Sequence, residues 1–553
     1  MNHHHHHHHD HDHPLPEALD QAVPDEALPP DGLSRRAMLR RAGLLGAGLA
    51  VAPGILGATA SAAPPPRGGY RWLAGDHHIH TQYSLDGRYR VIDHVRQGAA
   101  HGLDWMVITD HGGPTHARIG VERVHPEIVA ARRDVPEALV FQGLEWNIPA
   151  AEHGTVFVHP GREEVRVLQE FEGSFDGIVR NALTNTPANE ALAIAGIDFL
   201  ADALRRRRIE DVLFLANHPA RQGIDTPHEI RNWRDAQPHI AVGMEAAPGH
   251  QAAGIAKPFG AGLSRGYYFM EPGPDSFPAY PPASYRTFGG FDWMTATVGG
   301  LWDSLLAEGR PWWVTANSDS HAIYGDTAVT GPGSNFDRDG KLADAVHGKV
   351  PDLTNADFWP GAYTRTHVGA DGHSYRAVMA GIRAGRVWVD HGALVAGLDI
   401  RLRTADRWAR DSVTLGGVLR ARRGTALELV ISVDLARLPN WAQFVPKLAR
   451  VDIIQGAVTG PVADRDTFSA PKTKVVRSFT VNATAGTAKF THALGRLDEP
   501  FYLRLRGTDG KRVAVGLGGA AVDPAGPAMD VAGDADPWED LWFYTNPMWA
   551  LPA

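Results

Sequence analysis

Short apolar runs alternate with helical patterns through the first two thirds of the chain, and each run stops at polar residues. Apolar residues at helical spacing between 91 and 102 lead into the apolar run 105–108, which ends in Thr109-Asp110-His111. A strand, a helix and a second strand in this order predict a parallel pair. This alternation of apolar runs and helical patterns recurs as far as His391. We therefore expect an α/β domain over residues 70–392 with polar groups gathered at strand ends.

The pattern changes after residue 392 to alternation of apolar and polar positions, which is typical of half-buried strands. Alternating segments begin near residues 398, 427, 451, 475, 487 and 502, with turn residues between them. We therefore expect an all-β, sandwich-like domain over residues 393–553. Its apolar end, Trp538 to Tyr544, needs burial and is expected to pack against the α/β domain.

A targeting segment precedes the folded part of the chain. Arg35-Arg36 stands before an apolar stretch, which small residues follow as far as Ala60-Ser61-Ala62. This order over residues 34–63 resembles a twin-arginine export signal. Pro53 and Gly54 interrupt the apolar stretch, so a permanent membrane span is not expected. The resemblance implies a secreted protein whose partner during export is the twin-arginine machinery.

Two further N-terminal segments flank this signal. Residues 1–33 form a His-rich leader that begins with His3 to His9 and continues as Asp-His alternation. The leader is either a purification tag or a native metal-binding tract, and the Asp-His alternation favours the native tract. The Pro- and Gly-rich residues 64–69 are interpreted as a linker.

Composition narrows the possible chemistry. A chain of 553 residues exceeds one compact core, and its 43% hydrophobic content is that of a globular protein. The formal net charge of -9 disfavours a stable nucleic-acid partner. Because the chain has no cysteine, any metal ion must be bound by His, Asp or Glu, and the 29 histidines offer many such ligands.

Histidines and carboxylates follow the predicted strands in a fixed order. His78 and His80 lie two residues apart at the end of a short strand, so both side chains point to the same side and can bind one metal ion. A lone histidine is as often an ordinary hydrogen-bonded residue, but the ordered set favours a metal site. In chain order the candidate metal ligands are His78, His80, Asp86, His111, Glu145, His153, His218, Asp319 and His321.

This order of H-x-H, Asp, T-D-H, Glu, two separated His and a closing D-x-H resembles the PHP family, named for polymerase and histidinol phosphatase. The resemblance covers residues 70–392 and implies a distorted (β/α)7 barrel with two or three divalent metal ions, zinc, manganese or iron, that hydrolyses phosphate esters. It implies a first metal on His78, His80, Glu145 and Asp319, a second on Glu145, His153 and His218, and a third on Asp86, His111 and His321. It also implies catalytic roles for Asp319, His321, His111 and Glu145.

Residues near the ligands have candidate supporting roles. Phosphate ester cleavage needs positive charge beside the phosphoryl oxygens. Arg88 and Arg221 are candidate substrate-binding residues because guanidinium binds phosphate bidentately, with solvated surface arginines as the alternative. Ligating histidines need hydrogen-bond acceptors, which Asp76, Asp110 and Asn217 can supply.

Two long segments and one further carboxylate complete the candidate site. Residues 246–290 and 322–372 are too long for simple connections and are interpreted as walls or a lid that select the substrate. Glu245 also follows a predicted strand, and either lines the site or has a structural role.

The sequence thus favours a secreted metal-dependent phosphoesterase acting on a small-molecule or polymer phosphate ester. The alternatives are an exported protein that binds metal without catalysis, or one that binds glycans through its β domain. Phosphomonoesters and phosphodiesters both remain open as substrates.

Overall fold

The computed structural model of this protein describes residues 69–255, 257–263, 272–285, 287–288, 290–406, 411–509 and 541–553. The predicted leader, export signal and linker lie outside the described residues, except for Gly69 at the end of the linker. Within the described ranges, none of the helices combines the length and the apolar character that a membrane crossing requires.

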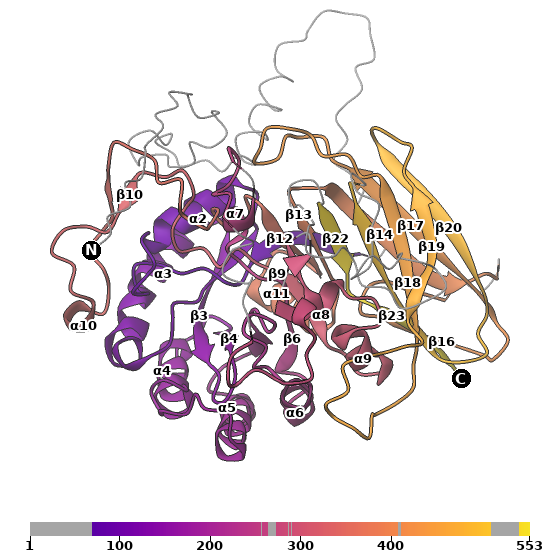
Figure 1. Ribbon diagram of the computed structural model, residues 1–553, viewed down its shortest axis with the longest axis horizontal. Coiled ribbons are helices and arrows are strands. Elements are labelled where there is room, and N and C mark those ends of the chain that lie inside the picture. Colours follow the sequence, from indigo (N-terminus) through magenta and orange to yellow (C-terminus); the bar gives the residue numbers. More distant parts are fainter. Residues whose placement is uncertain are drawn as a thin grey trace, which may run out of the picture.

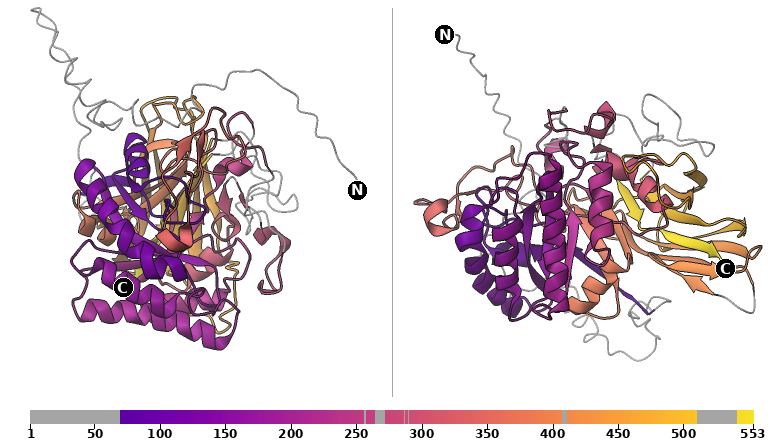
Figure 2. Two further views of the ribbon diagram at one scale, coloured as in Figure 1. Left: turned by 90° about the vertical axis from the view of Figure 1, so that its left-hand side faces the viewer. Right: turned by 90° about the horizontal axis from the view of Figure 1, so that it is seen from below.

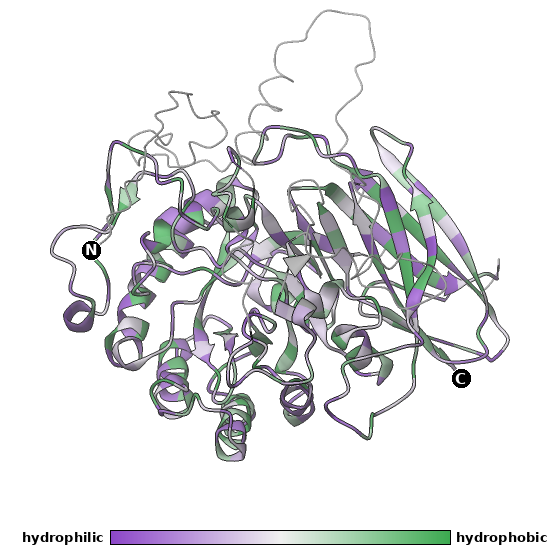
Figure 3. Ribbon diagram, in the orientation of Figure 1, coloured by the Kyte–Doolittle hydropathy of each residue, from purple (hydrophilic) through white to green (hydrophobic). Residues whose placement is uncertain are grey.

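Three parallel strands open the fold, as the alternation of apolar runs and helical patterns predicts. β1 (Arg71–Asp76), β2 (Trp105–Ile108) and β3 (Leu139–Asn147) pair side by side in that order. The helices α2 (Val91–Ala100) and α3 (Val121–Asp134) connect them. The helices carry hydrophobic and hydrophilic residues on different sides (Figure 3), as expected for helices that cover a sheet.

The sheet becomes mixed at β4 (His153–Val158), which pairs antiparallel with both β3 and β5 (Val212–Ala216). Residues 148–152 alone join β3 to β4, and so short a connection cannot carry a crossover helix. Parallel pairing resumes from β5 to β6 (Ala241–Ala247) and β9 (Trp313–Ala316). In Figure 2, the indigo to magenta helices stand in a row on the outer side of these strands.

The mixed α/β class is therefore confirmed, whereas a closed (β/α)7 barrel is not. The hydrogen-bonded order β1, β2, β3, β4, β5, β6, β9 is an open path, and β1 pairs on its other side with β12 (Thr364–Ala370). β9 curves back to contact β12 and β13 (Val387–His391). Thr366 links β12 to β9, because its hydroxyl group accepts a hydrogen bond from the Ala316 N–H and donates one to the Ala316 carbonyl.

Helices and short strands complete the α/β part. They are η3 (His116–Gly120), α4 (Glu164–Phe175), α5 (Pro187–Arg205), α6 (Pro227–Ala236), α7 (Gln251–Gly254), η5 (Pro282–Tyr285), β7 (Thr287–Phe288), β8 (Phe291–Asp292), α8 (Trp293–Ala296), α9 (Leu301–Ala307), β10 (Ala328–Val329), α10 (Phe336–Asp339), β11 (Val346–His347) and α11 (Tyr375–Arg383).

The chain after residue 392 forms a large sheet-rich region, drawn in orange and yellow in Figure 1. One four-stranded sheet contains, in order, β15 (Ser412–Val413), β14 (Val395–Thr404), β17 (Ala426–Leu435) and β20 (Thr487–Arg496). The other strands join the main sheet: β16 (Val418–Ala421), β18 (Arg450–Ala457), β19 (Lys474–Thr480), β21 (Phe501–Thr508), β22 (Trp542–Thr545) and β23 (Met548–Pro552). Both sheets contribute residues to one hydrophobic cluster.

The main sheet runs through the predicted boundary between residues 392 and 393. β13, before the boundary, pairs antiparallel with β22, near the C-terminal end. Leu541, Trp542, Phe543 and Tyr544 are buried there, as their apolar character predicts, whereas Trp538 to Asp540 lie outside the described residues. Hydrogen bonding thus joins the two parts of the chain in one continuous sheet.

Buried ion pairs also connect the two parts. Asp303 in α9 pairs with Arg504 in β21 at 2.7 Å, and neither side chain is exposed to solvent. We expect Arg504→Met to lower the free energy of unfolding by about 3–5 kcal/mol, because the substitution leaves the Asp303 carboxylate buried without its cation. Arg423→Met, at the exposed pair with Glu499, is the matched control and should change stability by less than about 1 kcal/mol in chemical denaturation.

His94 on α2 makes the fold sensitive to acid. Its two ring nitrogens are buried and make no hydrogen bond of regular geometry, and burial, with the charge of His321, lowers the pKa of His94 to about 3. The unfolded chain binds this proton near pH 6.5, so stability present above pH 6.5 is lost as pH falls towards 3, by up to about 1.4 kcal/mol per pH unit. Denaturation at several pH values should show a shallower acid decline for His94→Leu, and equal declines would contradict this role.

Candidate metal centre

The first group of ligands lies where β1 and β9 end. His78 and His80 follow β1, and Asp319 follows β9. Asp76 joins the two loops, because one carboxylate oxygen accepts the His78 N–H at 2.9 Å and the other accepts the Ser318 N–H at 3.0 Å. The Nε2 atoms of both histidines consequently lie 3.1 Å from Asp319 Oδ1.

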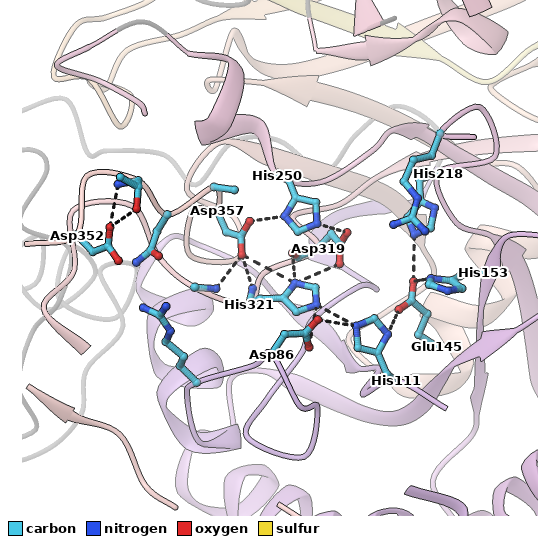
Figure 4. Close-up of a pocket in the computed structure, with 16 residues that line it drawn as sticks. Asp86, His111, Glu145, His153, His218, His250, Asp319, His321, Asp352 and Asp357 are labelled. Carbon is cyan, nitrogen blue, oxygen red and sulfur yellow. Dashed lines mark hydrogen bonds and ion pairs between the residues drawn. The ribbon is translucent and has the colours of Figure 1, made fainter. Parts of the chain in front are cut away.

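Glu145, at the end of β3, stands at the centre of the cluster. Its Oε1 atom lies 2.9 Å from His78 Nε2, 3.0 Å from His153 Nδ1 and 3.2 Å from His218 Nε2. Its Oε2 atom lies 2.6 Å from His111 Nδ1. His80 Nε2 lies 3.4 Å from the same oxygen, so one buried carboxylate faces five histidines from four segments, a geometry suited to bridging two cations. Figure 4 shows Glu145 with three of them, His111, His153 and His218.

A third group of ligand-type atoms lies at the outer edge of the same cluster. His111 Nε2 is 3.2 Å from His321 Nε2, and Asp86 Oδ2 is 3.3 Å from His111 Nε2. The imidazole of His80 stacks on that of His321, with ring centroids 3.8 Å apart. The structure thus brings all nine predicted ligands into one cluster, whereas their division among metal ions stays a prediction.

The partners of the ligating histidines differ from those expected. Glu245 contacts His78 Nδ1 at 2.9 Å and accepts the His218 N–H at 2.9 Å, so this strand-end carboxylate supports the site. Ser84 lies 3.0 Å from His80 Nδ1. Asp76 and Asp110 were expected to accept from imidazoles, but they bind backbone N–H groups and hydroxyls of the site loops instead. Asn217 donates to Glu145 Oε1 at 3.2 Å.

Three residues of the site have left-handed backbone conformations although none is glycine. The φ angles are +29° at His218, +54° at His250 and +48° at Asp319. Such conformations cost of order 1–3 kcal/mol each and persist only where surrounding contacts enforce them. Their concentration beside the cluster indicates that the loops are shaped to aim these side chains inward.

Burial and neighbouring charges shift the pKa values of several candidate ligands in the metal-free cluster. Burial disfavours the charged form of Glu145, but the facing His153, His78 and His111 outweigh it and hold its pKa well below the usual range. Burial also acts to lower the pKa of His111, yet Glu145 and Asp86 raise it to about 10. The opposite holds for His80, where burial and the charges of His321 and His111 press the pKa well below its ordinary value.

The donor set fits divalent cations. Donor atoms of His80, His111 and His321 lie within 4.8 Å of one another, and so do those of His78, Glu145 and His218. The buried His80 Nε2 has no hydrogen bond of regular geometry and faces two carboxylate oxygens. Mixed imidazole and carboxylate ligands suit zinc, manganese or ferrous iron.

The cluster forms the floor of a cavity of about 600 Å³ (Figure 4). Both candidate arginines line it. Arg221 is held by Glu152 at 2.9 and 3.3 Å, and Arg88 donates to the Ala328 carbonyl at 3.1 Å. Residues 352–357 form one wall, as expected for the segment after the closing D-x-H motif.

The other long segment contributes His250, which the sequence motifs do not predict. Its Nε2 atom lies 3.0 Å from Asp319 Oδ2, and its other ring nitrogen contacts Asp357. Tyr280 and Tyr285, in the same long segment, are buried and do not line the described cavity. The available signal in the sequence was a histidine soon after the strand that carries Glu245, but no recurring spacing marked it.

Two solved structures resemble the chain weakly. A two-domain protein containing a predicted PHP-like metal-dependent phosphoesterase, from Bacteroides vulgatus ATCC 8482, is 13% identical, with a TM-score of 0.32 over 86% of this chain and 100% of that one. An Endonuclease Q complex with a 27-mer duplex substrate is 10% identical, with a TM-score of 0.24 over 57% of each chain. At these scores neither likeness carries an argument about this protein.

No curated protein matches the chain. A family model, in contrast, matches part of it, and the matched part includes the ends of β1, β2 and β3 and the start of β4, where many of the cluster's ligands stand. Residues 76–180 of this chain, which carry His78, His80, Asp86, His111, Glu145 and His153, match the PHP domain.

Proposed function

We propose that this protein is a metal-dependent hydrolase of phosphate esters. The observation that carries the proposal is the position of Glu145 between His78, His111, His153 and His218, with Asp319 beside the same histidines. Buried carboxylate and imidazole groups that converge from several strands form a donor set that suits zinc, manganese or ferrous iron. The PHP match over residues 76–180 supports the same chemistry.

The nine candidate ligands would hold up to three divalent ions. His78, His80, Glu145 and Asp319 would hold one divalent ion, Glu145 with His153 and His218 a second, and Asp86, His111 and His321 a third. Bound zinc, manganese or iron would lower the pKa of a water molecule and neutralise charge on the phosphoryl oxygens. The buried partners Glu245 and Ser84 orient His78 and His80, which keeps their ligand nitrogens aimed at the cluster.

Arg88 and Arg221 are the proposed substrate-binding residues. Both line the cavity, and they stand beside different ligands, Asp86 and His218. The ion pair with Glu152 fixes the orientation of the Arg221 guanidinium group in the cavity wall. Within the described residues Arg88 makes no ion pair, which leaves its guanidinium available to a phosphate oxygen.

We also propose that the protein is exported through the twin-arginine pathway and acts outside the cell. The support is the order of Arg35-Arg36, the apolar stretch and Ala60-Ser61-Ala62. This pathway carries folded proteins, which suits an enzyme that must acquire its metal ions before release.

The first test combines metal content with hydrolysis. Metal in the purified protein is measured by mass spectrometry, and hydrolysis of p-nitrophenyl phosphate and bis(p-nitrophenyl) phosphate is followed with and without chelator. Bound metal with chelator-sensitive hydrolysis supports the proposal, and the preferred compound identifies a monoester or diester substrate. Bound metal without turnover of either compound favours a non-catalytic metal-binding protein, and absence of metal contradicts the assigned centre.

A further inference from the structure

His250 is brought to the cluster by a loop that packs tightly on the closing motif. The loop follows β6, and His250 N–H donates to the Ser318 carbonyl at 3.3 Å. A Cβ atom on Gly249 would lie 2.0 Å from Asp319 Cβ and 2.4 Å from the Ser318 carbonyl oxygen. Glycine at this position therefore permits the close approach that places His250 beside Asp319.

The side chain of His250 distinguishes the two oxygens of Asp319. Oδ2 contacts His250 Nε2 at 3.0 Å, whereas Oδ1 faces His78 and His80 at 3.1 Å each. Asp319 is buried and has a left-handed backbone, so its carboxylate needs a partner to fix its rotation. His250 supplies that partner at Oδ2, the oxygen that does not face His78 and His80.

Asp357 fixes His250 in turn. One carboxylate oxygen of Asp357 contacts His250 Nδ1, and the other accepts the N–H groups of His321 at 2.7 Å and Ala322 at 2.8 Å. Asp357 is 1% exposed, so these contacts are shielded from water. Figure 4 shows the resulting chain from Asp357 through His250 to Asp319.

We propose that His250, held by Asp357, is a positioning residue that turns Asp319 so that Oδ1 binds the metal ion shared with His78 and His80. The inference rests on the proposed function and deepens it, because neither His250 nor Asp357 belongs to the ligand set implied by the sequence motifs. His250 contacts the carboxylate oxygen that faces neither His78 nor His80, so it would act on the metal ion through Asp319.

Cobalt binding provides a direct readout. Co²⁺ is titrated into the metal-free full chain, and its visible absorption is recorded for the original protein, His250→Ala and His250→Gln. We expect His250→Ala to need about 10- to 100-fold more Co²⁺ for half-maximal absorption, the range typical of residues that orient metal ligands. His250→Gln keeps one N–H donor for Asp319 and should recover part of this loss.

His367→Gln is the matched control. His367 is also buried and contacts a carboxylate, Asp390, at 2.9 Å, but it does not belong to the described cavity lining. Its Co²⁺ titration should equal that of the original protein. Asp357→Asn gives a second test of the same chain without changing His250, and it should weaken Co²⁺ binding in the same direction.

Hydrolysis at low and saturating metal separates positioning from direct participation in the reaction. A positioning role predicts that His250→Ala regains most of its activity at saturating metal. A loss that persists at full occupancy, or a Co²⁺ titration unchanged in His250→Ala and Asp357→Asn, overturns the inference. If His250→Ala does not fold, His250→Gln and Asp357→Asn decide it. Failure of the original protein to bind metal or cleave esters would instead contradict the proposed function.

Discussion

Glu145→Gln is expected to lower the rate of phosphate ester hydrolysis by about 1000-fold or more. Several kcal/mol of transition-state stabilisation depend on the metal ions, and each 1.36 kcal/mol changes the rate tenfold. The substitution keeps the size of the side chain but removes the charge that faces His78, His111, His153 and His218. The amide also turns an N–H donor towards these imidazoles, so metal binding should fail at more than one position.

The measurement is kcat/KM together with bound metal per chain. Glu172→Gln is the matched control, because Glu172 is a buried carboxylate that contacts His116 at 3.0 Å and does not line the described cavity. The Glu172→Gln variant should retain bound metal and hydrolytic activity even if its free energy of unfolding falls. Full metal content and near-original activity in Glu145→Gln would show that Glu145 does not bridge the site.

Metal affinity should rise steeply with pH, by up to about tenfold per pH unit for each proton displaced. In the metal-free protein, Glu145 and Asp86 raise the pKa of His111 to about 10, so His111 is protonated at neutral pH. A metal ion must displace this proton, and displacement becomes easier as pH approaches 10. The same shift stabilises the metal-free fold below pH 6.5, and this contribution is lost as pH rises from 6.5 through 10.

Competition with a chelator of known proton affinity, at several values between pH 6 and 9, measures this dependence. His111→Gln removes one titrating group, so its affinity should be lower but should change less with pH. A pH-independent affinity in the original protein, or an equal slope in both proteins, would exclude proton displacement from His111. Proton release during metal addition gives an independent check in weakly buffered solution.

Part of the ligand set was predictable from local pattern, because several ligands stand just after apolar strands, and the resemblance to the PHP family implied the rest. Trp105 to Ile108 is apolar and ends at His111, and Val212 to Ala216 ends before His218, so local periodicity alone places these side chains at strand ends. The parallel pairing of β1, β2 and β3 follows from the same alternation of strand and helix patterns. Alternation of apolar and polar residues likewise predicted the sheet-rich region after residue 392.

Other features depend on which distant segments pack together. The direction of β4 follows from the short connection after β3, and β22 joins β13 although the whole sheet-rich region separates them in the chain. His250 shows no motif in the sequence, since its role comes from the close approach of Gly249 to Asp319.

The sequence by itself determined the types and order of the candidate ligands, because residue identity and short spacings are local properties. Only the tertiary structure decided that Glu145 faces five histidines, that Glu245 supports His78, and that Asp357 holds His250 against Asp319. These contacts join segments far apart in the chain. They form because packing of the whole sheet brings strand ends together, and hydrogen-bond geometry then selects which neighbouring side chains meet.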